Sequence, residues 1–280
     1  MFIRDYNINI YSPQGDLITI TKPFTVKFRI TRMISANANQ CSLTIHNLGL
    51  STRSKLYKDR YTLNKYWQII ISAGYDKVEV VFQGNITECY SYKQGTECIT
   101  EVDATSGIYG IQNGFVSKTY NKDTQKKTII EDVIKTMPYI LKGVLGTPTD
   151  GSNPRGTVLL GQSAYVLNNL TGGNYFVDNE TLNVISDEEY IGTEMLQLDS
   201  SILLSTPRRR DTFLDCETLF YSQAKLGYMV ELKSKVPEFN GQYKIMGFTH
   251  DVEISGSVAG RATTLINLNA GTGALKKAAG

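Results

Sequence analysis

The stretch that decides the fold reads GYMVELKS at 227–234, QYKIMGFTHDVEI at 242–254 and RATTLINL at 261–268. Apolar and polar residues alternate along the first two runs, as they do in a strand with one buried face. Asn240-Gly241 stands between these runs, and this pair favours a tight turn between antiparallel strands. The segment 255–260 supplies a second turn before the third run. We therefore predict a three-stranded antiparallel meander near the end of the chain.

Composition limits the possible classes of protein. The chain has 280 residues, enough for one large core or about two or three small ones. A formal net charge of +2 gives no general case for nucleic-acid binding. The N-terminal residues lack the basic and apolar regions of a secretory signal, and no apolar run approaches the ~20 residues that span a bilayer. We expect no membrane insertion by this chain.

The four cysteines are widely spaced and form no Cys-x-x-Cys pair. Cys89 and Cys98 flank a predicted turn at Gln94-Gly95 and could face each other across two strands. Without a secretion signal we favour free thiols, and a bond between these two cysteines stays an open alternative.

Residues 1–107 form the first predicted unit. Alternating runs indicate seven strands, and a short helix is expected from Thr52 to Tyr57 with Ser51 as its N-cap. Seven short strands and one helix in this length are typical of a compact antiparallel barrel or sandwich. The segment from Ser35 to Gln40 reads as a polar loop.

The pattern changes after Gly107. Helical spacing of apolar residues predicts helices over 124–137 and 162–170, followed by a small hairpin over 175–185. The Gly/Pro-rich segment 141–156 reads as irregular. Residues 108–200 are therefore an α+β unit, residues 201–270 return to strands, and residues 271–280 read as a flexible C-terminal tail. The fold class is mainly β with an α+β insert, and the first and last units share a layout.

No catalytic, cofactor or metal site is expected. The two histidines, His46 and His250, lack metal-ligand spacing, so each reads as a hydrogen-bonding residue on a strand surface or at an interface. Glycoside cleavage needs two carboxylates about 5–10 Å apart. The acidic run Asp187-Glu188-Glu189, with Glu88 or Glu101 as a second partner, is better explained as a solvated turn.

Several segments that contain no candidate catalytic residues resemble a known protein family. The run NANQCSLTIHNL at 37–48, followed by STRSKL at 51–56, resembles the first β-domain of bacteriophage baseplate hub proteins. Residues 164–185 resemble the short helix, aromatic strand and acidic turn of that family. The runs LGYMVEL at 226–232, FNGQYKI at 239–245 and GFTHDV at 247–252 resemble its second β-domain.

The resemblance implies two tail-tube-like antiparallel β-barrel domains, at 1–107 and 201–270, that flank the α+β domain. It implies a structural virion protein without enzymatic activity, present in the host cytoplasm during assembly. Three copies would form a homotrimer with a pseudo-sixfold ring that adapts a hexameric tail tube to a trimeric central spike. The implied partners are the tail tube or distal tube protein, the central spike and baseplate wedge proteins, with DNA passing through the lumen.

Candidate interface residues follow from this implication. The basic run Arg208-Arg209-Arg210 reads as a solvated loop or as a contact with an acidic neighbour or with DNA. Asn37 and Asn39 belong to a loop that we expect to contact the tube, as does the segment 206–212. The outer edges of the terminal meander are expected to meet a neighbouring subunit.

Two other functional classes stay open at this point. One is a cell-wall or carbohydrate-binding β-module of a phage tail, in which some of the 17 tyrosines would stack on sugars. The other is an endolysin-like enzyme that would depend on Asp187 or Glu188.

Overall fold

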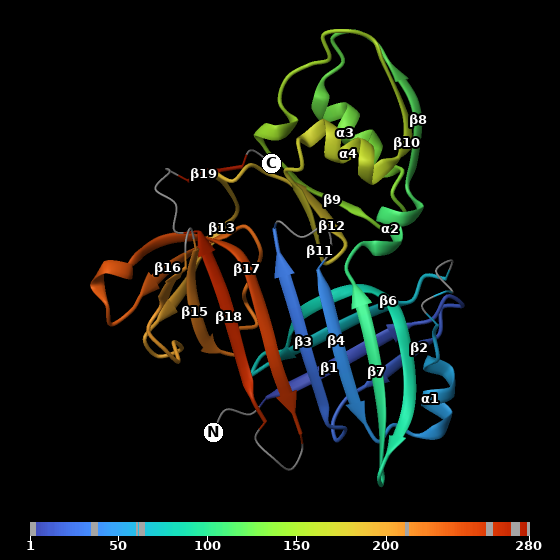
Figure 1. Ribbon diagram of the computed structural model, residues 1–280, viewed down its shortest axis with the longest axis vertical. Helices are drawn as coiled ribbons and strands as arrows, with labels where there is room; N and C mark the ends of the chain where they lie inside the picture. Colours follow the sequence, from blue (N-terminus) through green and yellow to red (C-terminus); the bar gives the residue numbers. More distant parts are fainter. Residues whose placement is uncertain are drawn as a thin grey trace.

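The computed structural model describes residues 4–34, 39–59, 61, 65–210, 213–255, 260–269 and 275–278. The chain is mainly β, with 54% of its residues in strands and 15% in helices, so the predicted class is confirmed. Figure 1 shows a broad antiparallel sheet with a smaller α+β part at one end.

The terminal meander forms as predicted, from three antiparallel strands. They are β16 (Tyr228–Lys233), β17 (Gly241–Ile254) and β18 (Ala262–Asn269). The connection from β16 to β17 differs from a two-residue turn, because the 3-10 helix η2 (Pro237–Phe239) lies within it. Asn240 closes this loop: its Oδ1 accepts the backbone N–H of Ser234 at 2.6 Å.

The first part of the chain contains the seven predicted strands within its described residues. These are β1 (Asp5–Tyr11), β2 (Leu17–Ile20), β3 (Val26–Met33), β4 (Gln40–His46), β5 (Gln68–Gly74), β6 (Glu79–Gln94) and β7 (Glu97–Thr105). The short helix α1 (Leu50–Leu56) begins one residue before the predicted cap. Gly49, not Ser51, is the N-cap, and its carbonyl accepts the N–H groups of Thr52 and Arg53.

One continuous sheet joins the two ends of the chain, with strand order β14-β15-β18-β17-β3-β4-β7-β6-β5-β1-β2. Here β14 is Arg208–Arg210 and β15 is Phe213–Leu219. The central pair β17–β3 is antiparallel, with Val252 opposite Phe28. Among the described strands no sheet closes into a barrel, so two separate barrels are not found.

Burial explains why β3 and β17 pair. β3 alternates buried and exposed side chains, and β17 alternates buried and partly buried ones from Phe248 to Ile254. Val252, Ile254 and Phe220 belong to the same buried cluster as Phe28 and the rest of the first unit. Burying a side chain of this size stabilises the fold by about 1.5–3 kcal/mol. The first unit therefore completes its core with residues of the last unit, which favours one shared sheet over two closed barrels.

The edges of the meander are covered, contrary to expectation. β18 pairs with β15, and β16 pairs in parallel with β13 (Glu189–Asp199). The free ends of the long path lie instead at β14 and β2. The sequence had placed residues 189–199 in the α+β unit, but Ile191 and Leu198 pack in the cluster of the last unit.

Two runs of five strands repeat one pattern of antiparallel pairing. In the run β3–β4–β5–β6–β7, the pairs are β3–β4, β5–β6, β6–β7 and β4–β7. In the run β14–β15–β16–β17–β18, the pairs are β14–β15, β16–β17, β17–β18 and β15–β18. The shared layout expected from the sequence is present, and β17 corresponds to β6 as β14 corresponds to β3.

The middle part contains both predicted helices and the predicted hairpin. Its elements are α2 (Ile108–Asn113), β8 (Phe115–Tyr120), α3 (Lys126–Lys135), β9 (Leu141–Leu145), η1 (Thr147–Thr149), β10 (Thr157–Gln162), α4 (Ser163–Thr171), β11 (Tyr175–Asp178) and β12 (Thr181–Val184). The segment 141–156 is more regular than expected, because β9 pairs in parallel with β12. α2 and the β8–β10 pair were not predicted.

The C-terminal tail is docked where it is described. β19 (Lys276–Lys277) pairs with the start of β13, and Ala278 is buried in the cluster of the last unit. This differs from the flexible tail that the composition suggests. A Gly/Ala/Lys composition discourages an independent core but does not prevent strand addition to an existing edge.

Candidate functional site: the polar sheet face and its edges

Eight strands, β14-β15-β18-β17-β3-β4-β7-β6, form the part of the sheet that we call the wall (Figure 1). Since side chains alternate along a strand, one face of the wall packs on the core and the other carries polar groups. We call the second one the polar face. Its charged residues include Arg208, Arg210, Asp215, Glu217, Asp251, Glu253, Lys27, Arg29, Glu101, Asp103 and Glu88.

Charges on the polar face are grouped by strand. At the centre, the acidic β17 lies beside the basic β3, with Asp251 opposite Arg29 and Glu253 opposite Lys27. Opposite charges facing each other across two strands contribute about 0.2–1 kcal/mol per pair. The seam between the two halves of the chain is therefore electrostatically matched as well as hydrogen-bonded.

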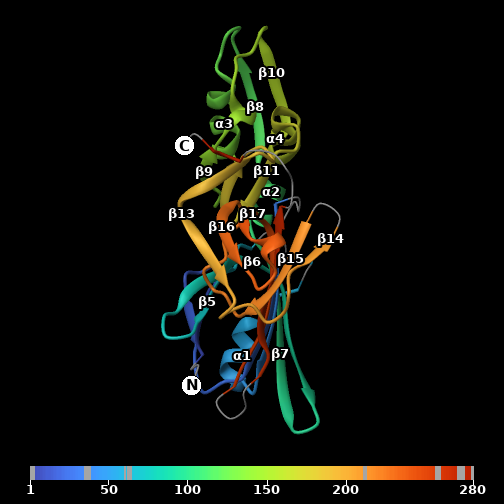
Figure 2. The same cartoon turned by 90° about the vertical axis from the view of Figure 1, so that its left-hand side faces the viewer.

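One end of the wall is the short strand β14. Arg208, Arg209 and Arg210 are all exposed and pair with β15, so the basic run is an edge strand rather than a loop. Arg208 lies opposite Asp215 on the polar face, and Arg210 Nη1 lies 3.9 Å from Asp215 Oδ2. Figure 2 views the molecule from this side, with β14 and β15 toward the viewer. No described strand covers the outer side of β14.

The other end of the wall is the hairpin of β6 and β7. Glu88 lies opposite Asp103, and Tyr90 lies opposite Glu101. Tyr92 Oη donates to Glu101 Oε1 at 2.9 Å, and Tyr90 Oη donates to Glu101 Oε2. These hydrogen bonds to Glu101 raise the pKa of both tyrosines. This end of the polar face is therefore acidic and aromatic.

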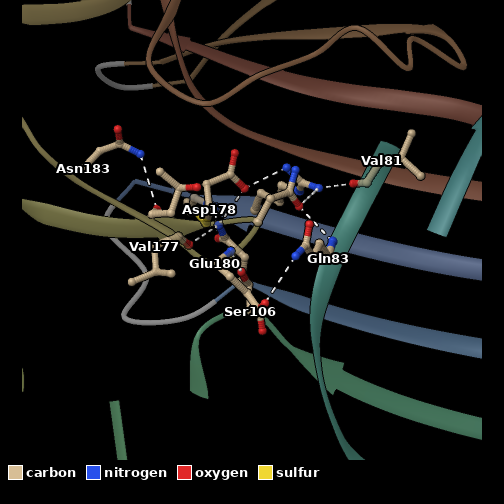
Figure 3. A network of polar contacts seen from close by, with 12 residues as sticks. Val81, Gln83, Ser106, Val177, Asp178, Glu180 and Asn183 are labelled. Carbon is tan, nitrogen blue, oxygen red and sulfur yellow. Dashed lines mark hydrogen bonds and ion pairs between the residues drawn. The ribbon is translucent and has the colours of Figure 1, made fainter. Parts of the chain in front are cut away.

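A buried polar network fixes the middle part of the chain to the sheet (Figure 3). Arg32 on β3 is 2% exposed, and its Nη1 donates to Asp178 Oδ1 at 2.7 Å. Arg32 Nη2 donates to Asn179 Oδ1 at 2.9 Å and to the Val81 carbonyl. Because a buried charge is costly unless it is paired, this contact specifies how the β11–β12 turn docks.

Glu180 completes the same turn. Tyr66 Oη donates to its carboxylate at 2.6 Å, and Gln68 and Gln83 donate at 3.1 and 3.3 Å. Burial raises the pKa of Glu180, and these hydrogen bonds oppose the shift. Asn179 and Glu180 have φ of 48° and 60°, the left-handed region used by tight hairpin turns.

The two predicted asparagine contacts have different outcomes. Asn39 is 1% exposed; its Nδ2 donates to the Val177 carbonyl at 2.9 Å, and its Oδ1 accepts the N–H of Met33 at 3.0 Å. Its side chain is thus used within the polar network of the β11–β12 turn. Asn37 lies outside the described residues.

The histidines do not meet. His250 is 1% exposed, so its predicted place on a strand surface is wrong; its Nδ1 lies 2.8 Å from Thr264 Oγ1. Burial, with Arg32 nearby, lowers the pKa of His250 to about 3. His46 is partly exposed and its Nδ1 lies 3.1 Å from Glu97 Oε2. The described part of the chain contains no cluster of side chains suited to hold a metal ion.

The acidic run at 187–189 has a structural role. Glu189 is 4% exposed, and its carboxylate accepts the N–H groups of Thr147 and Ser186 at 3.0 and 2.9 Å. The predicted solvated turn is therefore wrong for this residue. Lys244 lies beside it, buried, and donates to the carbonyl oxygens of Ser186 and Asp187 at 3.0 and 3.1 Å.

Other sequence expectations concern cysteines and membranes. All four cysteines are free. Across the described residues, no helix has the length and apolar character needed to cross a bilayer.

Sequence reasoning missed the polar network although the sequence carries a signal for it. Arg32 continues the apolar face of its strand two residues after Ile30, so period two places a charge in the core. A buried arginine requires an acidic partner. Asp178, within the predicted hairpin over 175–185, is such a partner, but nothing local to either segment links the two.

Solved structures with the same fold are phage-tail and secretion-system proteins. The 43 kDa tail protein of prophage MuSo2 from Shewanella oneidensis is 10% identical, with TM-score 0.63 over 94% of this chain and 97% of that one. A Neisseria meningitidis tail protein gives 10% identity and TM-score 0.57 over 94% and 96%. The E. coli c3393 protein, a component of the type VI secretion system, is 9% identical, with TM-score 0.55 over 88% of this chain and 73% of that one. Comparison with curated proteins gives no match.

The chain is a β-rich protein with a phage tail-like fold. The family model described as baseplate hub gp41 matches residues 7–257. This chain belongs to the baseplate hub gp41 family, and the predicted resemblance is confirmed. It is therefore a structural protein of the phage tail baseplate, and so of the virion.

Proposed function

We propose that three copies of this chain form a pseudo-sixfold ring that adapts a hexameric tail tube to a trimeric central spike. The observation that carries this proposal is the repeated strand pattern, which gives each chain two equivalent halves within one wall. Three chains then supply six equivalent units. The two units of each chain would be tail-tube-like domains at 1–107 and 201–270, with the α+β domain at 108–200 between them.

The physics of open sheets supports a ring. A sheet with free edges invites pairing with another chain, and a head-to-tail contact either closes into a ring or grows into a filament. The wall is open at β14, and its polar face suits an aqueous lumen through which DNA passes. Joining three walls would cover these edges and leave one continuous inner surface.

The remaining assignments extend this proposal to partners and place. The ring would contact the tail tube or distal tube protein on one side, the central spike on the other and wedge proteins around it. Assembly would take place in the host cytoplasm. The role needs no turnover, since it consists of matching one symmetry to another.

The oligomeric state tests this function. Light scattering after size exclusion, together with native mass spectrometry, should give three times the 31.2 kDa chain mass, and electron microscopy should show a ring with a central channel. A stable dimer, or an open filament without rings, would contradict the proposal. Adding the tube protein of the same virion should increase the trimer fraction if the tube nucleates assembly.

One observation favours the alternative of a cell-wall or carbohydrate-binding module. Tyr90 and Tyr92 are 38% and 39% exposed, and their stacked rings have centroids 6.1 Å apart, which offers an aromatic platform to a sugar ring. Binding of peptidoglycan fragments or a glycan array, lost in the variant with both tyrosines changed to alanine, would support it. A monomer that binds glycans would favour this alternative over the ring.

A further inference from the structure

The chain contains its own example of how two halves of the wall join. The seam between β17 and β3 lies within the chain, and β17 and β3 correspond to β6 and β14 in the repeated strand pattern. In a ring of equivalent units, the seam between chains would therefore place β6 of one copy beside β14 of the next. The internal seam predicts the geometry of that contact, which is antiparallel.

The internal seam also predicts its chemistry. β17 contributes Asp251 and Glu253 to the polar face, and β3 contributes Arg29 and Lys27 directly opposite them. An acidic strand thus meets a basic strand, and all four side chains lie on the same face of the sheet. The apolar residues between them, such as Val252, point to the core.

The two ends of the wall repeat this arrangement of charge. β14 contributes Arg208 and Arg210 to the polar face, whereas Arg209 lies opposite the buried Leu214 and so belongs to the other face. The β6–β7 end contributes its acidic side chains to the polar face, together with two tyrosine rings: Glu88, Tyr90, Tyr92, Glu101 and Asp103. Following strand pairs across the wall connects the two groups through one face without interruption.

We infer that β14 of one copy pairs antiparallel with the C-terminal half of β6 of a second copy, where Arg208 and Arg210 meet the acidic and aromatic group of Glu88, Tyr90, Tyr92, Glu101 and Asp103. This inference rests on the proposed ring and names the residues that close it. The contact is heterologous, because each chain gives a different edge to each neighbour.

The contact would place cations beside carboxylates. Asp103 is exposed on the polar face and Glu88 lies directly opposite it, so an arginine of a neighbouring copy would lie close to two acidic side chains. Arginine also binds favourably over tyrosine rings. The backbone of Cys89 forms hydrogen bonds with the backbone of Lys58, and after Cys89 no described strand pairs with the outer side of β6. The segment from Ser91 to Gln94 can therefore pair with a strand as short as β14.

Charge reversal in the full chain tests this seam. The variant R208E/R210E and the variant E88K/D103K each place like charges at the seam, and the combination of all four changes restores opposite charges with the polarity inverted. We expect each double variant to raise the trimer dissociation constant at least about tenfold, and the fourfold variant to return it to within about threefold of wild type. Sedimentation equilibrium at low salt measures this constant.

A matched control and a second readout keep the outcome clear. The variant K122E/K127E reverses two exposed charges in the middle part of the chain and should leave the constant unchanged. Circular dichroism verifies folding of every variant. As the seam is ionic, added salt should weaken the wild-type trimer more than it weakens an R208Q/R210Q trimer.

The possible results separate this inference from the proposed ring. If wild type is a trimer and none of these charge changes alters its dissociation constant, the proposed seam is wrong, whereas the proposed ring is not contradicted. A wild-type protein that stays monomeric from about 1 µM to about 100 µM, with or without tube protein, would overturn both. Equal weakening by the fourfold variant and the double variants would also contradict the seam, since complementarity would then play no part.

Discussion

Replacing Arg32 by methionine tests whether the buried ion pair holds the β11–β12 turn on the sheet. Methionine keeps the apolar stem and removes the charge. The side chains of Arg32 and Asp178 are 3% and 15% exposed, so the change leaves a nearly buried carboxylate with one weaker donor, Asn39 Nδ2 at 3.4 Å. Breaking a buried pair from one side costs about 3–5 kcal/mol. Partial exposure of Asp178 favours the lower end, about 3 kcal/mol.

Urea unfolding followed by the fluorescence of Trp67, the single tryptophan, measures this loss in the free energy of unfolding. The matched control is Arg29→Met, three residues earlier on β3 but exposed on the polar face, for which we expect a loss below about 1 kcal/mol. Hydrogen exchange should also accelerate at the β11–β12 turn in the Arg32 variant. It should stay slow there in the control.

A double-mutant cycle with Asp178→Asn isolates the pair. If the two side chains interact as the 2.7 Å contact indicates, the summed losses of unfolding free energy in the two single variants should exceed the loss in the double variant by about 1.5–3 kcal/mol. Additive losses within about 0.5 kcal/mol would refute the reasoning. They would mean that Arg32 acts through packing near Phe248, whose ring centroid lies 5.4 Å from its guanidinium carbon.

Three further predictions concern single buried or loop groups. Burial lowers the pKa of Lys244 from 10.5 to about 8, so the unfolded chain binds more protons than the folded chain between these pH values. In urea titrations, the free energy of unfolding of wild type should therefore rise by about 2–3 kcal/mol relative to Lys244→Met as pH rises from 8 to 10.5. Burial raises the pKa of Glu180, so the folded chain binds more protons than the unfolded chain above pH 4.5. Wild type should therefore gain stability relative to Glu180→Gln as pH falls from neutral toward 4.5. Parallel plots of unfolding free energy against pH for the two proteins would argue against this. Asn240→Ala removes the acceptor of the Ser234 N–H and should cost about 0.5–1.5 kcal/mol by thermal unfolding, whereas the exposed Lys235→Ala should cost almost nothing.

Local patterns predicted the strands and the longer helices well, because side-chain periodicity records which face is buried. The run from Val26 to Ile30 alternates apolar and polar residues without a break, and the structure buries the predicted face. Gly172, with φ of 65°, ends α4 as the sequence indicates. Short elements such as β9 and α2 carry too few residues for a period to be read.

Pairing between distant segments was not predictable from either segment alone. β3 and β17 show similar alternation, but many other strands share it, so nothing local selects this pair from the alternatives. The same limit hid the contact of Arg32 with Asp178. Burial of Asn39 was missed for a related reason: a polar loop residue is usually exposed, and only the docked β11–β12 turn covers it.

The central seam of the wall also sets the order in which this chain can fold as it is made. β3 emerges from the ribosome long before its partner β17, so at about 5–20 residues per second the edge of β3 waits unpaired until β17 has also been made. A chain that stops before β17 would lack the seam. Only chains that extend past β17 would then present a whole wall, which makes synthesis of β17 a condition for joining the baseplate.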